Sequence, residues 1–312
     1  MKCKKMLKFA ALALAICMMF SLAACGDKGS NTKSESNDTQ NNTVDTDKNT
    51  SENASESESN SESQPANAEQ ANNTLARIKE SGKIIVGTSA DYAPYEFHTL
   101  IDGKDTIVGF DIEIAKEIAK DLGVELEIQD MGFDGLLQAL NSDKVDFVIA
   151  GMTPDEERKK SVDFTDIYYK AQQGVMVRAE DKDKYKTIED LKGKKVGAQS
   201  TTIQEGIVKE QMPESQLVSL TKIPDLVMEL LNKKVEAIVV ELPVAKGYVN
   251  NNDKLAISDI QVQEDTGGSA IAVKKGNQEL VDLMNKTLKR LQEDGSIDRF
   301  VAEANEMNVI EN

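Results

Sequence analysis

The chain has 312 residues, a formal net charge of −17 at neutral pH and one histidine, His98. The acidic balance argues against nucleic acid or an anionic membrane face as a partner. The three cysteines all fall within the first 25 residues, so the folded part has no thiol for a disulfide or a nucleophile. We therefore expect neither a metal site nor any other cofactor.

Residues 1–25 read as a targeting segment. A lysine-rich start precedes the uncharged run from Phe9 to Phe20, which is too short to span a membrane comfortably. Leu22-Ala-Ala-Cys25 resembles a bacterial lipoprotein box, in which the cysteine is acylated and becomes the new N-terminus. The alternative is a plain signal peptide cut after Ala24. Acylation of Cys25 would place the protein on the outer face of the bacterial cell membrane.

Residues 26–73 consist mostly of Ser, Asn, Glu, Asp and Thr, and Val44 is their only large aliphatic residue. Such a stretch cannot bury enough apolar surface to offset the entropy of ordering it. We expect it to be a disordered tether between the lipid and the folded part.

The first half of the folded part alternates strand and helix patterns. The helix Phe110–Leu122 repeats apolar residues at helical spacing and stops at Gly123. Expected around it are strands at Lys83–Ser89, Val124–Ile128 and Val145–Ala150, and a short helix at Phe133–Asn141. This βαβ pattern predicts a mostly parallel sheet with helices on both faces.

The same alternation then restarts. Expected are strands at Gln172–Arg178, Lys194–Ser200, Glu236–Leu242 and Ser269–Val273, and helices at Thr201–Gln211, Pro224–Lys233, Pro243–Val249 and Gln278–Glu293, the last closing the chain. Two such units predict two lobes, 74–168 with 268–312 and 169–267, with a ligand cleft between their strand ends. Hinge strands are expected near Tyr168–Gln173 and Gln263–Gly268, where Gly267 and Gly268 would absorb the backbone change.

The stretch that follows the strand Val145–Ala150 carries the main binding signal. Gly151 ends the strand, Thr153 stands at an N-cap position, and Glu156 completes a Thr-x-x-Glu capping box for a helix starting there. The free N–H groups of such a helix start form an anion site, and Arg158 offers a planar fork suited to a carboxylate. The alternative is an ordinary strand–helix junction with a solvated arginine.

Three segments resemble the amino-acid-binding family of bacterial periplasmic solute-binding proteins (family 3), which feed ATP-driven (ABC) importers. They are Gly87-Thr-Ser-Ala-Asp-Tyr-Ala-Pro-Tyr-Glu-Phe97, Gly109-Phe-Asp-Ile-Glu113 and Ala150-Gly-Met-Thr-Pro-Asp-Glu-Glu-Arg158 with its continuation to Tyr169. The resemblance covers about Lys83 to Ala302 and includes the glutamine- and lysine/arginine/ornithine-binding proteins. It implies the type II periplasmic binding protein fold, in which each of two lobes is a mixed, mostly parallel sheet flanked by helices.

The resemblance also assigns roles to residues. Arg158 would pair with the ligand carboxylate, helped by the Thr153 hydroxyl and by N–H groups near Met152 and Thr153. Glu241 would accept from the ligand ammonium. The remaining candidates are Ala150 or Gly151 as a carbonyl for the ammonium, Thr202 as a second grip on the carboxylate, Tyr92 and Phe133 as walls, and Ser89, Asp91 and Gln199 facing the ligand side chain.

Each role has a structural alternative. Glu241 could be a solvated residue beside Pro243, Thr202 could be only a helix cap, and Tyr92 and Phe133 could belong to the core. One departure concerns the second lobe, where Thr201 occupies a place in which the family usually has glycine. This puts the fine shape of the second lobe's grip in doubt.

The resemblance implies a monomeric, non-enzymatic component of an ABC importer that hands an amino acid to a membrane permease. The ligand would bridge Arg158 and Glu241 and so stabilise a closed form of the two lobes. Asp91 and the acidic surface favour a polar or cationic ligand such as arginine, lysine or glutamine. Two alternatives stay open: a prephenate-type dehydratase with Glu241 as its acid or base, and a solute-sensing module with a separate membrane partner.

Overall fold

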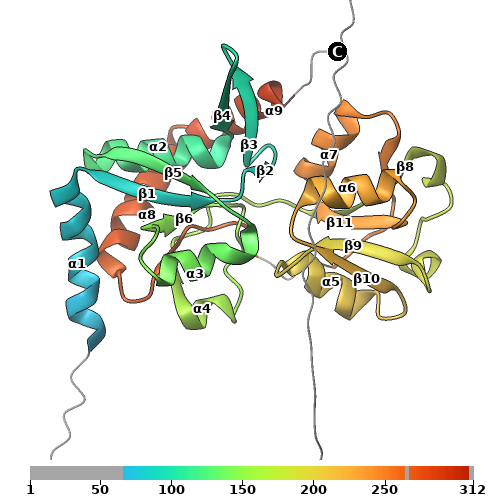
Figure 1. Ribbon diagram of the computed structural model, residues 1–312, viewed down its shortest axis with the longest axis horizontal. Coiled ribbons are helices and arrows are strands. Elements are labelled where there is room, and N and C mark those ends of the chain that lie inside the picture. The colour runs from blue at the N-terminus through green and yellow to red at the C-terminus, as the bar shows by residue number, and fades with distance from the viewer. Residues whose placement is uncertain (1–65, 264–266, 309–312) are drawn as a thin grey trace, which may run out of the picture. The chain divides into compact units, whose positions relative to one another are not determined.

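The protein is described by a computed structural model that covers residues 66–263 and 267–308 (Figure 1). The predicted signal peptide, Cys25 and most of the predicted tether lie outside these residues. Helix α1 (Ala66–Ser81) begins inside the segment that we expected to be disordered. Alanine and long unbranched side chains in this stretch favour a helix. The tether prediction therefore stands only for the residues before Ala66.

The first sheet has five strands in the order β5-β1-β6-β13-β7. Strand β1 runs parallel to β5 and β6, whereas β13 is antiparallel to β6 and β7. The strands are β1 (Lys83–Thr88), β5 (Glu125–Asp130), β6 (Phe147–Val148), β7 (Val162–Phe164) and β13 (Ala272–Lys274). The helices that contact this sheet or one another include α1, α2 (Phe110–Leu122), α3 (Leu136–Asn141), α8 (Gln278–Glu293) and α9 (Ser296–Met307).

The second sheet also has five strands, in the order β10-β9-β11-β8-β12. Strand β9 is parallel to β10 and β11, and β8 is antiparallel to β11 and β12. The strands are β8 (Gln173–Arg178), β9 (Lys195–Gln199), β10 (Gln216–Leu220), β11 (Ala237–Glu241) and β12 (Leu255–Ile257). The helices packed on it are α5 (Ile203–Gln211), α6 (Ile223–Leu231) and α7 (Leu242–Asn251). Two mixed, largely parallel sheets with their own helices confirm the expected fold class (Figure 1).

The chain crosses from one sheet to the other twice, because every strand of the second sheet falls between β7 and β13 in sequence. The two passing segments pair where Tyr168 N–H donates to Ser269 and Ser269 N–H donates to Tyr169, at 2.9 and 2.8 Å. Gly268 has φ of 102°, and a Cβ there would overlap the Tyr169 carbonyl. Glycine is therefore required at this crossing. The hinge and lobe boundaries stay predictions.

An antiparallel hairpin unit, which the sequence analysis did not predict, stands beside the first sheet. It consists of β2 (Asp91–Tyr92), β3 (Glu96–Ile101) and β4 (Lys104–Val108). Gly109 follows β4 with φ of 129°, and a Cβ on it would overlap the carbonyl oxygen of Tyr95. This close approach lets Asp111 N–H donate to the Tyr95 carbonyl at 3.0 Å. The start of α2 is thereby fixed against the start of β3.

Two helix predictions were wrong. The expected helix from Thr153 does not form, and α4 (Arg158–Ser161) is one short turn. The competing interaction is at Asp155, whose carboxylate accepts from Arg158 N–H at 2.8 Å and whose N–H donates to Thr153. The helix α8 does not close the chain either, because α9 follows it after Gly295.

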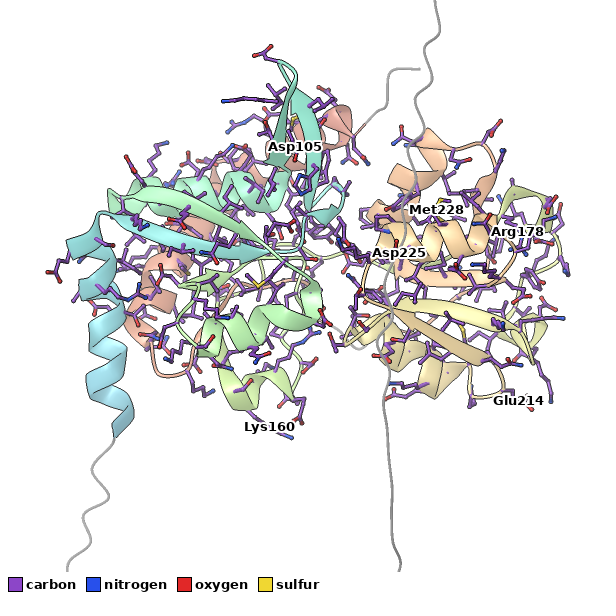
Figure 2. All side chains as sticks on the ribbon, viewed as in Figure 1. Asp105, Lys160, Arg178, Glu214, Asp225 and Met228 are labelled. Atoms are coloured by element: carbon purple, nitrogen blue, oxygen red, sulfur yellow. The ribbon has the colours of Figure 1, made fainter. Side chains whose placement is uncertain are left out.

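Arg178 shows how the second sheet supports a buried charge (Figure 2). Its Nη1 donates to the carbonyl oxygens of Leu230 and Val235 at 2.8 and 2.7 Å, and its Nε donates to Asp181. These bonds connect β8 with the C-terminal end of α6. Buried arginines are stable when their donors are satisfied in this way.

Candidate ligand-binding site

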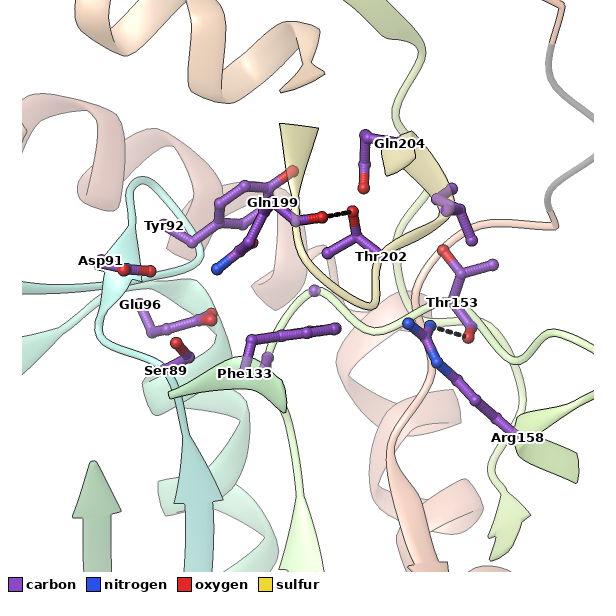
Figure 3. Close-up of a pocket in the computed structure, with 13 residues that line it drawn as sticks. Ser89, Asp91, Tyr92, Glu96, Phe133, Thr153, Arg158, Gln199, Thr202 and Gln204 are labelled. Carbon is purple, nitrogen blue, oxygen red and sulfur yellow. Dashed lines mark hydrogen bonds between the residues drawn. The ribbon is translucent and has the colours of Figure 1, made fainter. Parts of the chain in front are cut away.

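A cavity with an empty volume of about 350 Å³ lies where the carboxyl ends of β1, β6 and β9 meet the hairpin unit. Figure 3 shows the residues that line it: Ser89, Asp91, Tyr92, Glu96, Phe133, Ala150, Gly151, Thr153, Arg158, Gln199, Thr202, Ile203 and Gln204. The lining comes from both sheets, and we call it the binding cavity.

One end of the binding cavity carries the guanidinium of Arg158. Its Nη1 donates to the Thr153 carbonyl at 2.7 Å (Figure 3), and its Nη2 donates to the Thr201 carbonyl at 2.8 Å. Thr153 precedes β7 in the first sheet's part of the chain, whereas Thr201 follows β9 of the second. The guanidinium therefore joins the two parts and still has N–H donors that these two bonds do not use.

The surroundings of Arg158 fix its position and its charge. Nε lies 3.4 Å from an Asp155 oxygen, and the guanidinium carbon lies 5.4 Å from the centre of the Phe133 ring. Burial lowers the pKa of Arg158, and the negative charge of Asp155 opposes this effect. Arginine nevertheless stays protonated in proteins. This end of the cavity thus presents a fixed cation that a carboxylate can reach.

The second sheet contributes the start of α5 to the same end. Thr202 is the N-cap of α5, where its hydroxyl oxygen accepts from Glu205 N–H at 3.4 Å and donates to the Gln199 carbonyl at 2.7 Å. It is therefore a helix cap and also part of the cavity wall. Gln204 in the first turn is buried and donates to Gln173 at 2.9 Å.

The other end of the binding cavity is acidic. Figure 3 shows Asp91, Glu96 and Ser89 together on one side, Arg158 with Thr153 on the other, and Phe133 between them. Glu96 is 0% exposed, no donor among the described residues reaches its carboxylate oxygens, and its side-chain hydrogen bond is with a second acid, Asp111. Burial, and next the charge of Asp111, raises the pKa of Glu96 well above its usual range. Burial thus favours the protonated, neutral form of Glu96.

Asp91 is the second acid at this end. Its Oδ1 has no hydrogen-bond partner among the described residues. Burial raises the pKa of Asp91 to about 6, although the charge of Lys222 opposes the shift. At neutral pH Asp91 therefore carries a negative charge that a cationic ligand group could compensate.

Asp111 lies behind Glu96 at the start of α2. Its Oδ2 accepts from Gly151 N–H and from the Tyr168 hydroxyl, both at 2.8 Å. Burial raises the pKa of Asp111 to about 6, while these two hydrogen bonds and a third with the Glu96 carboxyl group act against the shift. Asp111 thus holds the Gly151 backbone in the cavity wall and connects it to the crossing segment at Tyr168.

Aromatic rings form one wall. Tyr92 lines the binding cavity, and its ring centre lies 5.4 Å from that of Tyr95. Tyr95 is fully buried, and its ring centre lies 4.4 Å from that of Phe110. Tyr92 and Phe133 therefore face the cavity, and Tyr92 is at the same time continuous with an aromatic cluster of the core.

Two of the predicted site residues lie outside the cavity lining. Met152 is buried in the core beside α3, and its carbonyl accepts from Ala270 N–H at 2.9 Å. Glu241 is buried at the end of β11, where it accepts a hydrogen bond from the Tyr95 hydroxyl. This bond links the two sheets' parts of the chain. The structure brings together the other ten: Ser89, Asp91, Tyr92, Phe133, Ala150, Gly151, Thr153, Arg158, Gln199 and Thr202.

Sequence reasoning missed Glu96, Ile203 and Gln204 as lining residues. Glu96 stood within a quoted motif, Ala93-Pro-Tyr-Glu-Phe97, where an acid between two large aromatic residues is the available signal. An acid in such an apolar setting is expected either to be paired or to serve a ligand. Ile203 and Gln204 follow the predicted Thr202 directly, so the first turn of α5 could have been included as a whole.

The described part of the chain contains no cluster of His, Cys, Asp or Glu that could hold a metal ion. Within the same residues, no helix is long and apolar enough to cross a membrane.

Two mixed β-sheets, each flanked by helices, are connected by two crossings of the chain, and residues from both sheets' parts line one cavity. This architecture defines a two-lobe binding protein of the type II periplasmic fold. Residues 84–304 match the bacterial extracellular solute-binding proteins, family 3. The chain belongs to this family, which places it outside the cytoplasm.

Individual relatives agree with this assignment. The arginine-binding extracellular protein ArtP of Bacillus subtilis is 44% identical over 228 residues, which are 71% of this chain and 86% of ArtP. A probable histidine-binding protein of Campylobacter jejuni is 33% identical, over 75% of this chain and 90% of the relative. The L-arginine-bound structure of AbpA, an amino acid ABC transporter substrate-binding protein from Streptococcus pneumoniae, is 41% identical with a TM-score of 0.74, covering 76% of this chain and 100% of AbpA.

These relatives are binding proteins, and the chain is accordingly a solute-binding protein and not an enzyme. The dehydratase interpretation of Glu241 gains no support from them. In the structure, Glu241 is engaged by Tyr95 and does not line the cavity.

Proposed function

We propose that this protein is the substrate-binding component of an ABC importer and that its ligand is L-arginine. The observation that carries the proposal is the polarity of the binding cavity, with a fixed guanidinium at one end and two incompletely paired acids at the other. A ligand that fits this arrangement carries a carboxylate at one end and a cation at the other. The relatives that are named as binding arginine agree with this choice.

The carboxylate of the ligand is proposed to bind Arg158, together with Thr153 and the start of α5 at Thr202. Each charge-assisted hydrogen bond in such a site contributes about 1.5–3 kcal/mol. Because the Thr153 and Thr201 carbonyls already fix the guanidinium, little side-chain entropy is lost when the ligand arrives.

The ligand guanidinium is proposed to lie between Asp91 and Glu96, with Ser89 and Gln199 beside it. Phe133 and Tyr92 would flank its planar group and its methylene chain. A neutral glutamine side chain would leave the charge of Asp91 uncompensated, and a burial cost of this kind is what separates ligands strongly.

The ligand ammonium needs acceptors between these ends. The carbonyl groups of Ala150 and Gly151 are suited to this role by their place in the lining. We propose that Glu241 joins them only when the lobes change their relative position, because here it accepts from Tyr95. The crossings at Tyr168–Gln173 and Gly267–Gly268 would supply the hinge for that change.

The wider setting completes the proposal. Acylation at Cys25 and the polar residues that follow it would keep a monomeric binding protein at the outer face of the cell membrane. There it would deliver arginine to the permease of its importer. Mass spectrometry of the N-terminal peptide from membranes tests the anchor, because an unmodified N-terminus after Ala24 would contradict it.

Calorimetry of the purified protein with L-arginine, L-lysine, L-citrulline, L-glutamine and L-histidine tests the ligand. Citrulline has the shape of arginine without its positive charge, so it isolates the contribution of the acidic end. We expect arginine to bind most tightly and citrulline at least about 100-fold more weakly, in line with the cost of an unpaired buried charge. Equal binding of the two, or a preference for glutamine or histidine, would contradict the proposal.

A further inference from the structure

More acids lie in and behind the acidic end of the binding cavity than one cation can neutralise. Glu96 on β3, Asp91 on β2 and Asp111 on α2 are close enough for the charges of Asp111 and Asp91 to raise the pKa of Glu96. Glu241 on β11 acts on Glu96 in the same direction, more weakly. Acids from three other elements thus surround one fully buried carboxyl group.

The partners of these acids differ. Asp111 accepts from the Gly151 amide and the Tyr168 hydroxyl, and Glu241 accepts from the Tyr95 hydroxyl. No such donor reaches the oxygens of Glu96 among the described residues, although the side chain lines the cavity. Its side-chain hydrogen bond is instead with the carboxyl group of Asp111, and this bond raises the pKa of Glu96 and opposes the rise at Asp111. Two buried carboxylates side by side without a cation are costly, so a proton on Glu96, donated toward Asp111, takes the place of a compensating cation.

From this geometry we propose that Glu96 is a specificity-determining residue that exchanges its proton for the cationic group of the ligand. The inference rests on the proposed function, since it requires a cationic ligand in the binding cavity. In the empty site Glu96 is neutral. When a guanidinium enters, the carboxylate becomes the favoured form, and the proton leaves to solvent. The net charge at this end then changes less than the ligand charge alone would change it.

The proton exchange has a defined consequence for how the affinity for the ligand depends on pH. If binding releases a proton, affinity must rise with pH over the range in which Glu96 is protonated in the empty protein, by up to about tenfold per unit for one full proton. A neutral ligand of the same shape leaves Glu96 protonated, so its affinity does not follow this dependence. The site would discriminate between cationic and neutral side chains more strongly at higher pH.

Calorimetry in a series of buffers with different ionisation enthalpies measures the proton directly. At about pH 7.5, Asp91 and Asp111 are already largely ionised, because the pKa of each is about 6. A proton released there is therefore assigned to Glu96. We expect roughly half to one proton released per L-arginine bound, and none on binding of L-citrulline.

Two variants sharpen the assignment. Glu96→Gln resembles the protonated acid in shape and should bind arginine more weakly with no proton release. Asp91→Asn keeps Glu96 and should still release the proton. Release that persists in Glu96→Gln would overturn the inference. If Glu96→Gln did not fold, the arginine–citrulline difference in the unmodified protein would decide alone.

The failure of the inference differs from the failure of the proposed function. Tight binding of arginine without proton release would overturn the role of Glu96 and leave arginine as the ligand. The absence of arginine binding in every buffer would overturn both. Equal proton release with arginine and citrulline would also overturn the inference, because the proton would then follow the ligand's common amino-acid part.

Discussion

The cationic and the acidic ends of the binding cavity are built on different principles. Arg158 is held by two carbonyl groups and an adjacent carboxylate, so its charge is compensated before a ligand arrives. Glu96 is more deeply buried but has no such partner among the described residues. The first end is therefore preorganised, whereas the second depends on a proton or a ligand for its stability.

This difference indicates how the two ends divide the task of recognition. A preorganised guanidinium fits the carboxylate of any α-amino acid and gives affinity with little discrimination. An uncompensated acid favours only those side chains that bring a positive charge, so it gives specificity at the expense of stability in the empty protein. Substitutions at one end should therefore leave the contribution of the other end intact.

The largest effect is expected from Arg158→Ala at the cationic end. Loss of the charge-assisted hydrogen bonds to the carboxylate should weaken L-arginine binding by at least about 100-fold, or roughly 3 kcal/mol. Calorimetry measures the change. Lys160→Ala is the matched control, because Lys160 belongs to the same short helix but is exposed and pairs only with Glu157 among the described residues. Binding of the Arg158 variant within a few-fold of the unmodified protein would contradict the assigned end.

Glu96→Gln should affect the stability of the empty protein in a pH-dependent manner. The folded protein holds the Glu96 proton more tightly than the unfolded chain, so Glu96 lowers the free energy of unfolding as pH rises above its unfolded pKa. The variant lacks this penalty. Relative to the unmodified protein it should gain stability, on the order of 1–2 kcal/mol, between mildly acidic and mildly alkaline pH.

Thermal unfolding without ligand at both ends of that pH range measures this gain. Lys83→Gln is a useful control, because Lys83 is exposed and its pairing with Glu127 lies away from the cavity. A difference between the Glu96 variant and the unmodified protein that does not change with pH would show that Glu96 is ionised, or absent from the titration, in the empty protein.

A smaller effect is expected from Asp91→Asn. Asp91 is less buried than Glu96 and is already opposed by Lys222, so its loss should weaken arginine binding by about tenfold, or roughly 1.4 kcal/mol. Citrulline binding should change less. Competition calorimetry with L-arginine and L-citrulline would measure the ratio of their affinities in the variant and in the unmodified protein. If both ligands weakened equally, Asp91 would be supporting the cavity wall and not recognising the cation.

The smallest effect concerns the backbone that holds Arg158. Thr201 has φ of 62°, a left-handed conformation that is strained for a β-branched residue. Thr201→Gly should raise the free energy of unfolding by roughly 0.5–1 kcal/mol and leave arginine affinity nearly unchanged. The neighbouring substitution Thr202→Ala should lower the free energy of unfolding by about 1 kcal/mol, because the cap of α5 is lost. Chemical denaturation measures the free energy of unfolding of both variants. A lower free energy of unfolding for Thr201→Gly than for the unmodified protein would contradict the strain inferred at Thr201.

The sequence allowed the two sheets and the cationic end to be predicted because their signals are periodic or local. Helices α2 and α8 end where their apolar spacing ends, and Arg158 follows a buried strand at a fixed distance. The helix at Thr153 could not be excluded from sequence, because Asp155 competes for the same backbone donors only in three dimensions. Helix α9 had an apolar repeat at Ile297, Phe300 and Ala304 that was overlooked.

The acidic end was harder to predict for a physical reason. Glu96 lies in a short hairpin strand, and its environment is created by Asp111 and Gly109 of the following helix start. Neither contact can be inferred from spacing within one element. The same holds for the bond between Tyr95 and Glu241, which joins residues that are 146 positions apart.

A crystal structure of the complex with L-arginine would test the central claim most directly, because the two ends make the orientation of the ligand a yes-or-no observation. The account predicts the ligand carboxylate on Arg158 and the start of α5, and its guanidinium between Asp91 and Glu96. A ligand bound in the reverse direction, or one whose guanidinium points away from both acids, would contradict it.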